Sequence, residues 1–322
     1  MRMIIYGAGG IGGVVGGHLA RVGHQVVLIG RPGHMNAIRE HGLRLITPVG
    51  THTLRLPAFT SPDQISFQPD DVVLLCMKSQ NTDEALSNLC SVTEDIPIFC
   101  LQNGVRNEEI AAKYFPRVYG VMVRVGAVYL TDGEVIARRD PPGWLIIGRY
   151  PSGTEDLVEV VAANLRTAGF VVMTTSDIMP YKWGKLMGNL ANAIGAITNA
   201  RGEDNNQIAR AARDEAIRIL AQANIRWVSD GQLATEWPDF NVPPRSILST
   251  EAQSSTWQSL ARGRDTVETD FLNGEIVRLA ERLSIRAPVN EALLHISQEM
   301  AAKGERPGKY TPTELGRLIR LE

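Results

Sequence analysis

The sequence predicts an α/β protein in which a doubly wound, mostly parallel sheet is followed by an all-α C-terminal domain. Three observations support this prediction. A glycine turn joins a short apolar strand to a helix near the start of the chain, short apolar runs recur up to about residue 173, and only helical patterns follow from about Ser176. We therefore expect two domains, residues 1–175 and residues 176–322.

The opening unit, residues 2–31, has the pattern of a strand, a glycine turn, a helix and a second strand. Gly7, Gly9 and Gly12 have G-x-G-x-x-G spacing: the first glycine makes a tight turn, the second lets backbone approach a pyrophosphate, and the third allows close packing of the helix. The helix N-terminus behind them favours an anion, since its macrodipole is equivalent to about +0.5 charge. This pattern predicts a Rossmann-like dinucleotide site formed by Gly7, Ala8, Gly9, Gly10, Ile11 and Gly12.

Arg31 indicates which dinucleotide is bound. An NAD site usually places Asp or Glu about 20 residues after the glycines, for the ribose 2′-hydroxyl, but the first acidic residue of this chain is Glu40. Arg31 stands where the second strand ends, and its planar guanidinium can pair with a 2′-phosphate. We therefore predict NADP(H). The alternative is a glycine-rich helix packed closely on a sheet, with a solvated Arg31.

Further apolar runs of strand length are expected to extend the same sheet. The central ones are Asp71–Cys76 and Pro97–Leu101, which we expect to be parallel strands covered by helices on both faces. The remaining sheet elements are expected at residues 118–123, 144–147 and 170–173, with a hairpin around Asp132-Gly133 and a helix at 156–167.

Ligands bind outside the carboxyl ends of the strands in such a sheet. Lys78 and Asn103 follow the runs Asp71–Cys76 and Pro97–Leu101, so they are candidate contacts of the nicotinamide ribose or the substrate. A solvated lysine and a turn asparagine are about equally good interpretations of these two residues alone.

The second half of the chain is expected to contain only helices. Helical periodicity predicts them at residues 178–200, 204–224, 250–262, 266–284 and 288–303. Trp237–Arg245 is a proline-rich connection between two of them, and the tail from Gly304 is expected to be surface or loosely ordered.

Composition favours small-molecule chemistry. The 322 residues include 33 basic and 35 acidic side chains and no long basic run, which indicates neither a nucleic-acid groove nor an anionic membrane surface. Three cysteines and six histidines lack zinc-site spacing, so we expect no metal, with Cys76, Cys90 and Cys100 as buried thiols. No apolar run approaches the roughly 18 residues of a membrane span, and the first strand begins at residue 3, so a cytoplasmic protein is expected.

A polar stripe marks the helix predicted at residues 178–200. Lys185, Asn189 and Asn192 lie at i, i+4 and i+7, so on a helix they share one face, beside the small residue Gly188. An ammonium and two amides beside small residues suit the wall of a cleft. A lysine at a helix start with two asparagines bonded to neighbouring backbone explains the same periodicity equally well.

Glu268 also has two interpretations. Asp265 precedes it by three residues, which is the spacing of a capping box at a helix start, and spacing alone favours this role. Glu268 is also in phase with Phe271 and Leu272, which should face inward. A carboxylate on that face is partly buried and needs a partner.

Together these segments resemble the ketopantoate reductase family over nearly the whole chain. The resemblance rests on an N-terminal GAGGIG, Lys78, the turn Gln102-Asn103-Gly104, the helix with Trp183-x-Lys185-Leu186 and Asn189, and the segment Ser254-Ser255…Glu268-x-Asp270-x-x-Asn273-Gly274. It implies NADPH-dependent reduction of a 2-oxo acid to a 2-hydroxy acid, above all 2-dehydropantoate (ketopantoate) to pantoate in pantothenate biosynthesis.

The resemblance also implies roles for single residues. Lys185 is the general acid, and Glu268, the second catalytic residue, holds substrate and cofactor. Those expected to bind substrate are Lys185, Asn189, Asn192, Ser255 and Glu268. Those expected to bind cofactor, besides residues 7–12, are Arg31, Lys78, Asn103 and Ala127.

The chain departs from the family pattern at two asparagines. The second helix asparagine is expected at the position of Ala193, and here Asn192 precedes it; a further one is replaced by Arg201. There is also one extra residue between Gln258 and Glu268. Two other functions therefore stay open: an NADP-dependent oxidoreductase of the same fold acting on a different oxo acid or secondary alcohol, and an NADPH-binding sensor without turnover. A small-molecule 2-oxo acid is the only expected partner, with a homodimer as one option for the assembly.

Overall fold

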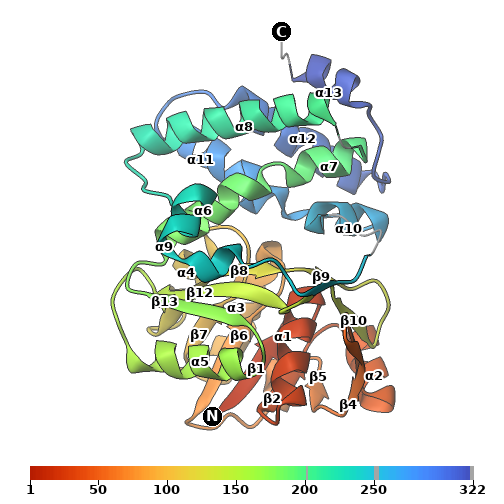
Figure 1. Ribbon diagram of the computed structural model, residues 1–322, viewed down its shortest axis with the longest axis vertical. Coiled ribbons are helices and arrows are strands. Elements are labelled where there is room, and N and C mark those ends of the chain that lie inside the picture. Colours follow the sequence, from red (N-terminus) through yellow and green to blue (C-terminus); the bar gives the residue numbers. More distant parts are fainter. Residues whose placement is uncertain (201, 250–253, 320–322) are drawn as a thin grey trace. The chain divides into compact units, whose positions relative to one another are not determined.

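The computed structural model (Figure 1) describes residues 1–200, 202–249 and 254–319, and the chain divides into two compact units. The first unit is Met1–Lys182 with Val228–Thr250, and the second is Trp183–Trp227 with Glu251–Glu322. The domain limit expected after residue 175 stays a prediction, because compactness does not show that either part folds by itself.

An eight-stranded sheet forms the centre of the first unit, in the order β13-β12-β8-β7-β6-β1-β2-β5. All neighbouring strands are parallel except β8 and β12, which are antiparallel. The strands are β1 Arg2–Tyr6, β2 Gln25–Ile29, β5 Ala58–Phe59, β6 Asp71–Leu75, β7 Ile98–Cys100, β8 Val118–Val125, β12 Gly143–Arg149 and β13 Val171–Thr175.

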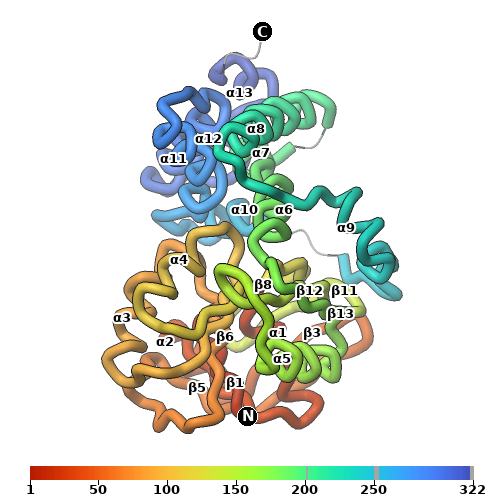
Figure 2. The backbone as a smooth tube through the Cα atoms, turned by 90° about the vertical axis from the view of Figure 1, so that its left-hand side faces the viewer, coloured from red at the N-terminus to blue at the C-terminus, as the bar shows by residue number. Residues whose placement is uncertain are grey.

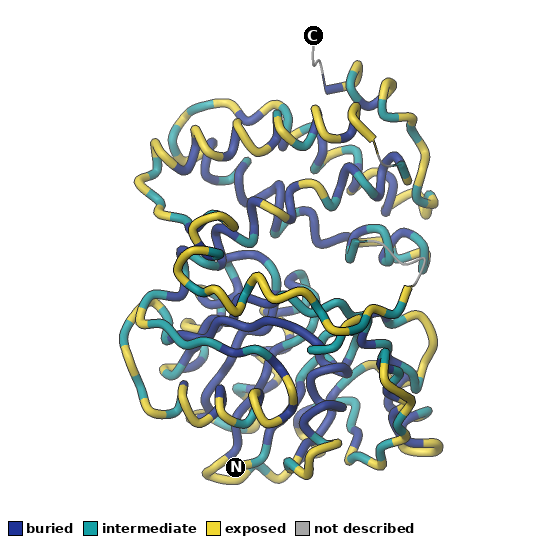
Figure 3. The backbone as a smooth tube through the Cα atoms, in the orientation of Figure 1, coloured by how far each residue is buried: buried dark blue, intermediate teal, exposed yellow. Residues whose placement is uncertain are grey.

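Helices cover both faces of this sheet (Figure 2). Successive side chains of a strand point to opposite faces, so one strand packs against helices on both sides. On one face Met3 and Ile5 pack with α1 (Gly10–Arg21) and α5 (Asp156–Thr167). On the other, Ile4 packs with α3 (Thr82–Cys90) and α4 (Asn107–Ala111). The central strands are almost entirely buried (Figure 3), which explains their continuous apolar runs. The predicted doubly wound, mostly parallel sheet is confirmed.

The hairpin predicted around Asp132-Gly133 forms, but not in the main sheet. Its strands β9 (Ala127–Val128) and β10 (Glu134–Ala137) pair antiparallel and belong to a second sheet of order β4-β3-β10-β9. The partners are β3 (Leu43–Thr47), which follows α2 (Pro32–His41), and β4 (Gly50–Leu54). The expectation that the hairpin extends the main sheet is wrong: Val135 packs on the far side of α1, where a Cβ at Gly13 would lie 2.6 Å from it.

Residues 228–250 return to the first unit, so the expectation of helices alone beyond Ser176 is wrong. This segment contains α9 (Asp230–Glu236), the 3₁₀ helix η3 (Pro238–Asn241) and the short strand β14 (Ser246–Ile247), which pairs with β11 (Arg139–Asp140). Its Val228 and Leu233 pack with Met122 and Ile146 of the main sheet. Apolar burial therefore decides where this segment lies.

The second unit consists of helices in the residues that the structure describes, and the first of them, α6, begins in the first unit. They are α6 Met179–Asn189, α7 Asn192–Thr198, α8 Glu203–Gln222, α10 Ser255–Ala261, α11 Asn273–Arg282, α12 Pro288–Ala302 and α13 Pro312–Leu318, with the 3₁₀ helix η4 at Glu268–Phe271. Their shared core includes Ile194, Ile208, Leu260, Leu293 and Leu315.

Two expected helices are divided in the structure. The helix predicted at 178–200 ends at Asn189 and resumes at Asn192; in between, the Leu190 carbonyl accepts a hydrogen bond from Asn273 Nδ2 at 3.2 Å. The helix predicted at 266–284 is η4 followed by α11. At the first break the Asn273 side chain satisfies a backbone carbonyl that a continuous helix would pair internally.

The tail contains α13, which the sequence does not predict. Thr311 and Glu314 form a capping box at its start, and Leu315 is fully buried. Of the two options expected for the tail, loose order is therefore wrong for residues 312–318, whereas a surface position is confirmed for all of them except the buried Leu315. Among the described helices, none is long and apolar enough to cross a membrane.

Candidate functional site

The glycine turn is shaped by steric limits on its backbone. Gly7 has φ +97°, and a Cβ on it would lie 2.3 Å from the Met77 nitrogen, so only glycine fits. A Cβ on Gly12 would lie 2.6 Å from the Gly7 carbonyl oxygen and 2.8 Å from the Cβ of Cys76. Gly7 therefore makes the turn, and Gly12 lets α1 lie close to the strands.

Space for a ligand remains at the second glycine. Gly9 is the N-cap of α1, and a Cβ there would meet its nearest neighbour, Tyr129 Cδ1, at 3.6 Å. The first turn of α1 holds no acidic residue, so nothing within it offsets the positive end of the helix macrodipole. These features fit a pyrophosphate in the position predicted for a dinucleotide.

Arg31 lies at the start of a second helix. It is exposed and is the N-cap of α2, with Pro32 in the first helical position and no acidic residue in the first turn. The guanidinium and the positive end of α2 both favour an anion near the end of β2.

A buried hydrogen-bond network connects the loops that follow β6 and β7. Asn107 Nδ2 donates to the Asn103 carbonyl at 2.8 Å and to Ser79 Oγ at 3.0 Å, while Thr82 Oγ1 donates to Asn107 Oδ1 at 2.9 Å. Gln102 Nε2 donates to Thr82 Oγ1 at 2.7 Å. The network fixes the backbone beside the half-buried Lys78 and Asn103. Thr82 and Asn107 are not predicted from the sequence, because nothing in their local pattern shows the pairing.

Ala127 lies on β9 next to the start of α1. A Cβ on Gly10 would lie 3.5 Å from the Ala127 Cβ. The hairpin therefore reaches the glycine turn, which gives this predicted cofactor contact a position beside the N-terminus of α1.

A buried ion pair anchors the first turn of α6 to the first unit. Lys182 and Glu108 are both almost fully buried and paired, and Lys182 Nζ also donates to the Gln102 carbonyl at 3.2 Å. Burial raises the pKa of the Glu108 carboxyl, and the charge of Lys182 opposes that rise. This ion pair is not predicted from the sequence. Its only local signal is a lysine three residues before Lys185, within an apolar stretch.

Lys185 and Asn189 lie on α6, one turn apart. Lys185 is half-buried and Asn189 is buried. Asn192 is half-buried at the start of α7, beyond the break, so the prediction that all three side chains form one stripe on a single helix is wrong for Asn192. Ala193, where the family pattern expects the second asparagine, is buried in α7; Arg201 lies outside the described residues.

Ser255 and Glu268 come from two further elements of the second unit. Ser255 is the first residue of α10, whose N-cap Ser254 donates its hydroxyl to the Asn192 carbonyl at 3.2 Å. Glu268 is only 4% exposed and begins η4, whose N-cap is Val267. The capping box with Asp265 is therefore wrong, and a buried carboxylate remains. Since α10 packs against α7 and contacts η4, the elements that carry Asn192, Ser255 and Glu268 are neighbours.

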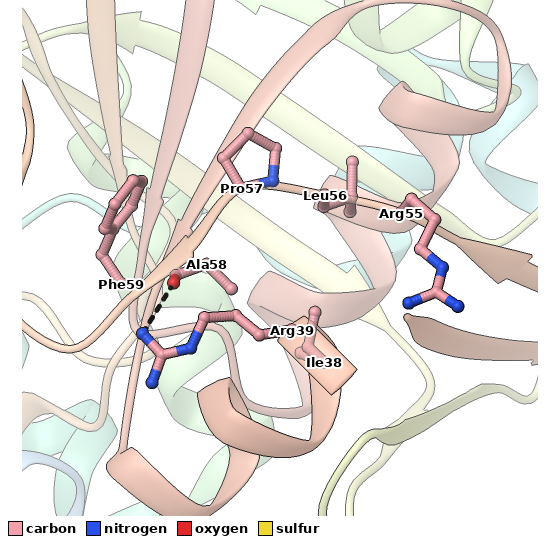
Figure 4. A pocket seen from close by; sticks show the side chains of 7 residues that line it. All are labelled: Ile38, Arg39, Arg55, Leu56, Pro57, Ala58 and Phe59. Carbon is pink, nitrogen blue, oxygen red and sulfur yellow. Dashed lines mark hydrogen bonds between the residues drawn. The ribbon is translucent and has the colours of Figure 1, made fainter. Parts of the chain in front are cut away.

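A pocket of about 450 Å³ on the first unit (Figure 4) contains none of the predicted site residues. Its lining is an apolar floor with two guanidinium groups: Ile38, Arg39, Arg55, Leu56, Pro57, Ala58 and Phe59. Arg39 Nη1 donates to the Ala58 carbonyl at 3.3 Å.

The cysteines do not form a site. All three are free; Cys100 is buried, whereas Cys76 and Cys90 are half-buried as residues, with the thiol of Cys76 turned inward, so the expectation of three buried thiols is wrong for Cys90. Burial raises the pKa of the Cys76 and Cys100 thiols. Within the described residues there is no group of three or more His, Cys, Asp or Glu that could hold a metal ion.

Comparisons with known proteins agree over both halves of the chain. The family model "Ketopantoate reductase PanE/ApbA" matches residues 3–152, and its C-terminal counterpart matches residues 177–301. The 2-dehydropantoate 2-reductase of Pyrococcus horikoshii is 34% identical over 303 residues, 90% of this chain and 94% of the relative. That of Archaeoglobus fulgidus is 30% identical over 303 residues, 92% and 96% of the two chains.

Solved structures show the same architecture. A PanE/ApbA family ketopantoate reductase from Ralstonia eutropha JMP134 superposes with a TM-score of 0.78 at 31% identity, covering 94% of this chain and 99% of that one. D-mandelate dehydrogenase with NADH and anilino(oxo)acetate has a TM-score of 0.81 at 21% identity and the same coverage, which shows the fold alone. This chain therefore belongs to the PanE/ApbA ketopantoate reductase family of oxidoreductases, which use a nicotinamide cofactor.

Proposed function

We propose that this chain reduces 2-dehydropantoate (ketopantoate) to pantoate with NADPH, the reductive step of pantothenate biosynthesis. The observation that carries the proposal is the half-buried Lys185 with the buried Asn189 one turn further along α6, in a chain that also has a dinucleotide-binding turn. The relatives named for this reaction, at 30% and 34% identity, support the choice of substrate.

Residues of the first unit are proposed to hold the cofactor. Backbone N–H groups of residues 7–12 at the start of α1 bind the pyrophosphate, and Arg31 pairs with the 2′-phosphate. Lys78 and Asn103 contact the nicotinamide ribose, and Ala127 contacts the cofactor beside the start of α1. Bound NADPH supplies the hydride that the ketone carbon accepts.

Residues of the second unit are proposed to bind and protonate the substrate. Lys185, as an ammonium, stabilises the negative charge that develops on the ketone oxygen and donates a proton to that oxygen. A positioned general acid raises the rate by a factor of about 10²–10⁴. Asn189 and Asn192 donate N–H groups that orient this oxygen. Ser255 binds the carboxylate, and Glu268 fixes a substrate hydroxyl or pairs with Lys185.

The test is cofactor consumption, followed by absorbance, with ketopantoate, other branched 2-oxo acids, secondary alcohols in the reverse direction, and no substrate. We expect rapid, NADPH-selective turnover of ketopantoate, with NADH slower. Turnover of another oxo acid alone refutes the pathway but keeps the lysine chemistry. NADPH binding without turnover of any compound favours a sensor and refutes the enzyme.

We also propose a cytoplasmic location and a homodimer, with the 2-oxo acid as the only ligand besides the cofactor. Light scattering of the purified protein tests the assembly, and a single-chain mass refutes the dimer.

A further inference from the structure

The loop between β9 and β10 lies against the N-terminal ends of both α1 and α2. A Cβ on Gly9 would lie 3.6 Å from Tyr129 Cδ1, and the Tyr129 ring centroid is 4.5 Å from that of His34 in α2. The Gly133 N–H donates to His34 Nδ1 at 2.8 Å. This loop therefore adjoins the two helix ends at which the phosphate groups of the cofactor are proposed to bind.

Asp132 brings a carboxylate to the start of α2. Its Oδ1 accepts a hydrogen bond from the Tyr129 hydroxyl at 2.5 Å, and its Oδ2 is 2.5 Å from where a Cβ on Gly33 would lie. Gly33 is two residues beyond Arg31. The sequence up to Glu40 has no acidic residue, but the fold supplies one from a hairpin far along the chain.

The two charged groups favour different forms of the cofactor. A carboxylate accepts a hydrogen bond from a ribose 2′-hydroxyl, as the acidic residue of an NAD site does. It repels a 2′-phosphate, whereas the Arg31 guanidinium attracts one. The same carboxylate near the N-terminus of α2 also stabilises the helix dipole, which is the purely structural alternative.

We propose that Asp132, held by the Tyr129 hydroxyl, sets the balance between NADPH and NADH by opposing the 2′-phosphate and accepting from the 2′-hydroxyl. This inference rests on the proposed cofactor site. The wild-type enzyme therefore discriminates less against NADH than Arg31 alone would predict. The residue that adjusts the ratio of the two affinities lies on the hairpin and not at the end of β2.

The test is the dissociation constant of each cofactor, measured by fluorescence titration without substrate. For Asp132→Asn we expect NADPH to bind about tenfold more tightly and NADH to bind equally or more weakly, since one like charge has been removed near the phosphate. Tyr129→Phe should shift the ratio in the same direction by a smaller factor. The effect of Asp132→Asn should shrink at 1 M salt, where the Debye length is about 3 Å.

Glu134→Gln is the matched control. Glu134 lies on the same hairpin and carries the same charge, but it pairs with Arg44 on β3, so its removal should leave the cofactor ratio unchanged. A ratio that is also unchanged in Asp132→Asn, with only the melting temperature altered, overturns the inference and favours the structural role. If wild-type protein binds neither cofactor, both this inference and the proposed function fail. If it binds both, but Asp132→Asn leaves the ratio of the two dissociation constants unchanged, this inference fails and the proposed function stands.

Discussion

The glycine turn of the first unit and the polar segment Lys185–Asn192 of the second unit are fixed in different ways. In the turn, positions are set by backbone contacts that any Cβ would violate, as at Gly7 and Gly12. In the polar segment, side chains carry the proposed chemistry, and distant partners such as Asn273 hold the backbone. Substitutions in the turn should therefore damage folding and cofactor binding together, whereas those in the polar segment should separate chemistry from folding.

Lys185→Ala provides the largest expected effect and tests this separation directly. We expect kcat to fall by about 10²–10⁴, because the developing alkoxide loses its acid. NADPH affinity and the melting temperature should stay near the wild-type values, since Lys185 is only half-buried. Steady-state kinetics, cofactor titration and thermal melting measure the three quantities. Loss of NADPH binding would contradict the assignment of this lysine.

Lys182, three residues earlier on α6, should behave in the opposite way. Glu108→Leu leaves the buried Lys182 without its charged partner, which costs about 3–5 kcal/mol of unfolding free energy. The double variant Glu108→Leu/Lys182→Met should recover much of that loss, because two apolar side chains need no partner. Urea unfolding measures both variants. Equal stability of the single and double variants would show that the pair is not the anchor of α6.

His18, on α1 behind the glycine turn, should make stability depend on pH. Burial, with a smaller contribution from the charge of Arg21, lowers the pKa of His18 from 6.5 to about 4. The unfolded chain therefore binds a proton that the folded chain does not. Uptake of this proton by the unfolded chain lowers the free energy of unfolding. The loss is absent above pH 6.5 and grows to about 3 kcal/mol as the pH falls toward 4. Between pH 4 and 6.5, the free energy of unfolding of His18→Leu should depend less on pH than that of the wild type. An unchanged slope would assign the pH dependence to other groups.

The smallest effects come from one substitution made in both regions. Gly12→Ala should destabilise the protein by about 1–3 kcal/mol, since its Cβ meets the Gly7 carbonyl at 2.6 Å. Gly188→Ala on α6 should instead stabilise it by up to about 1 kcal/mol, because apart from its own helical turn no atom lies within 4 Å of that Cβ. Thermal melting of the two variants compares them, and the same sign in both would remove the distinction between the regions.

The parts of the fold that the sequence predicts are those with local determinants. The βαβ unit around Gly7, Gly9 and Gly12 has its expected elements, and the helix at 156–167 has the expected bounds. These segments carry their own periodicity and turn residues, so neighbours along the chain suffice to define them.

The parts that the sequence does not predict depend on contacts between distant residues. The ion pair of Lys182 with Glu108 spans 74 residues, and the bond from Asn273 to the Leu190 carbonyl at the end of α6 spans 83. No local pattern contains either pairing, so the single helix expected at 178–200 is wrong. The assigned roles of Lys185, Ser255 and Glu268 stay predictions.

The return of residues 228–250 to the first unit has a consequence for protein engineering. Neither unit is encoded by one uninterrupted stretch of gene. A fragment that stops at Lys182 would leave Met122, Ile146 and Ile178 without the cover of Val228 and Leu233 and would be expected to aggregate. Chimaeras that exchange cofactor preference between relatives should therefore transfer residues 1–182 and 228–250 from the same parent, which requires three crossovers, after residues 182, 227 and 250.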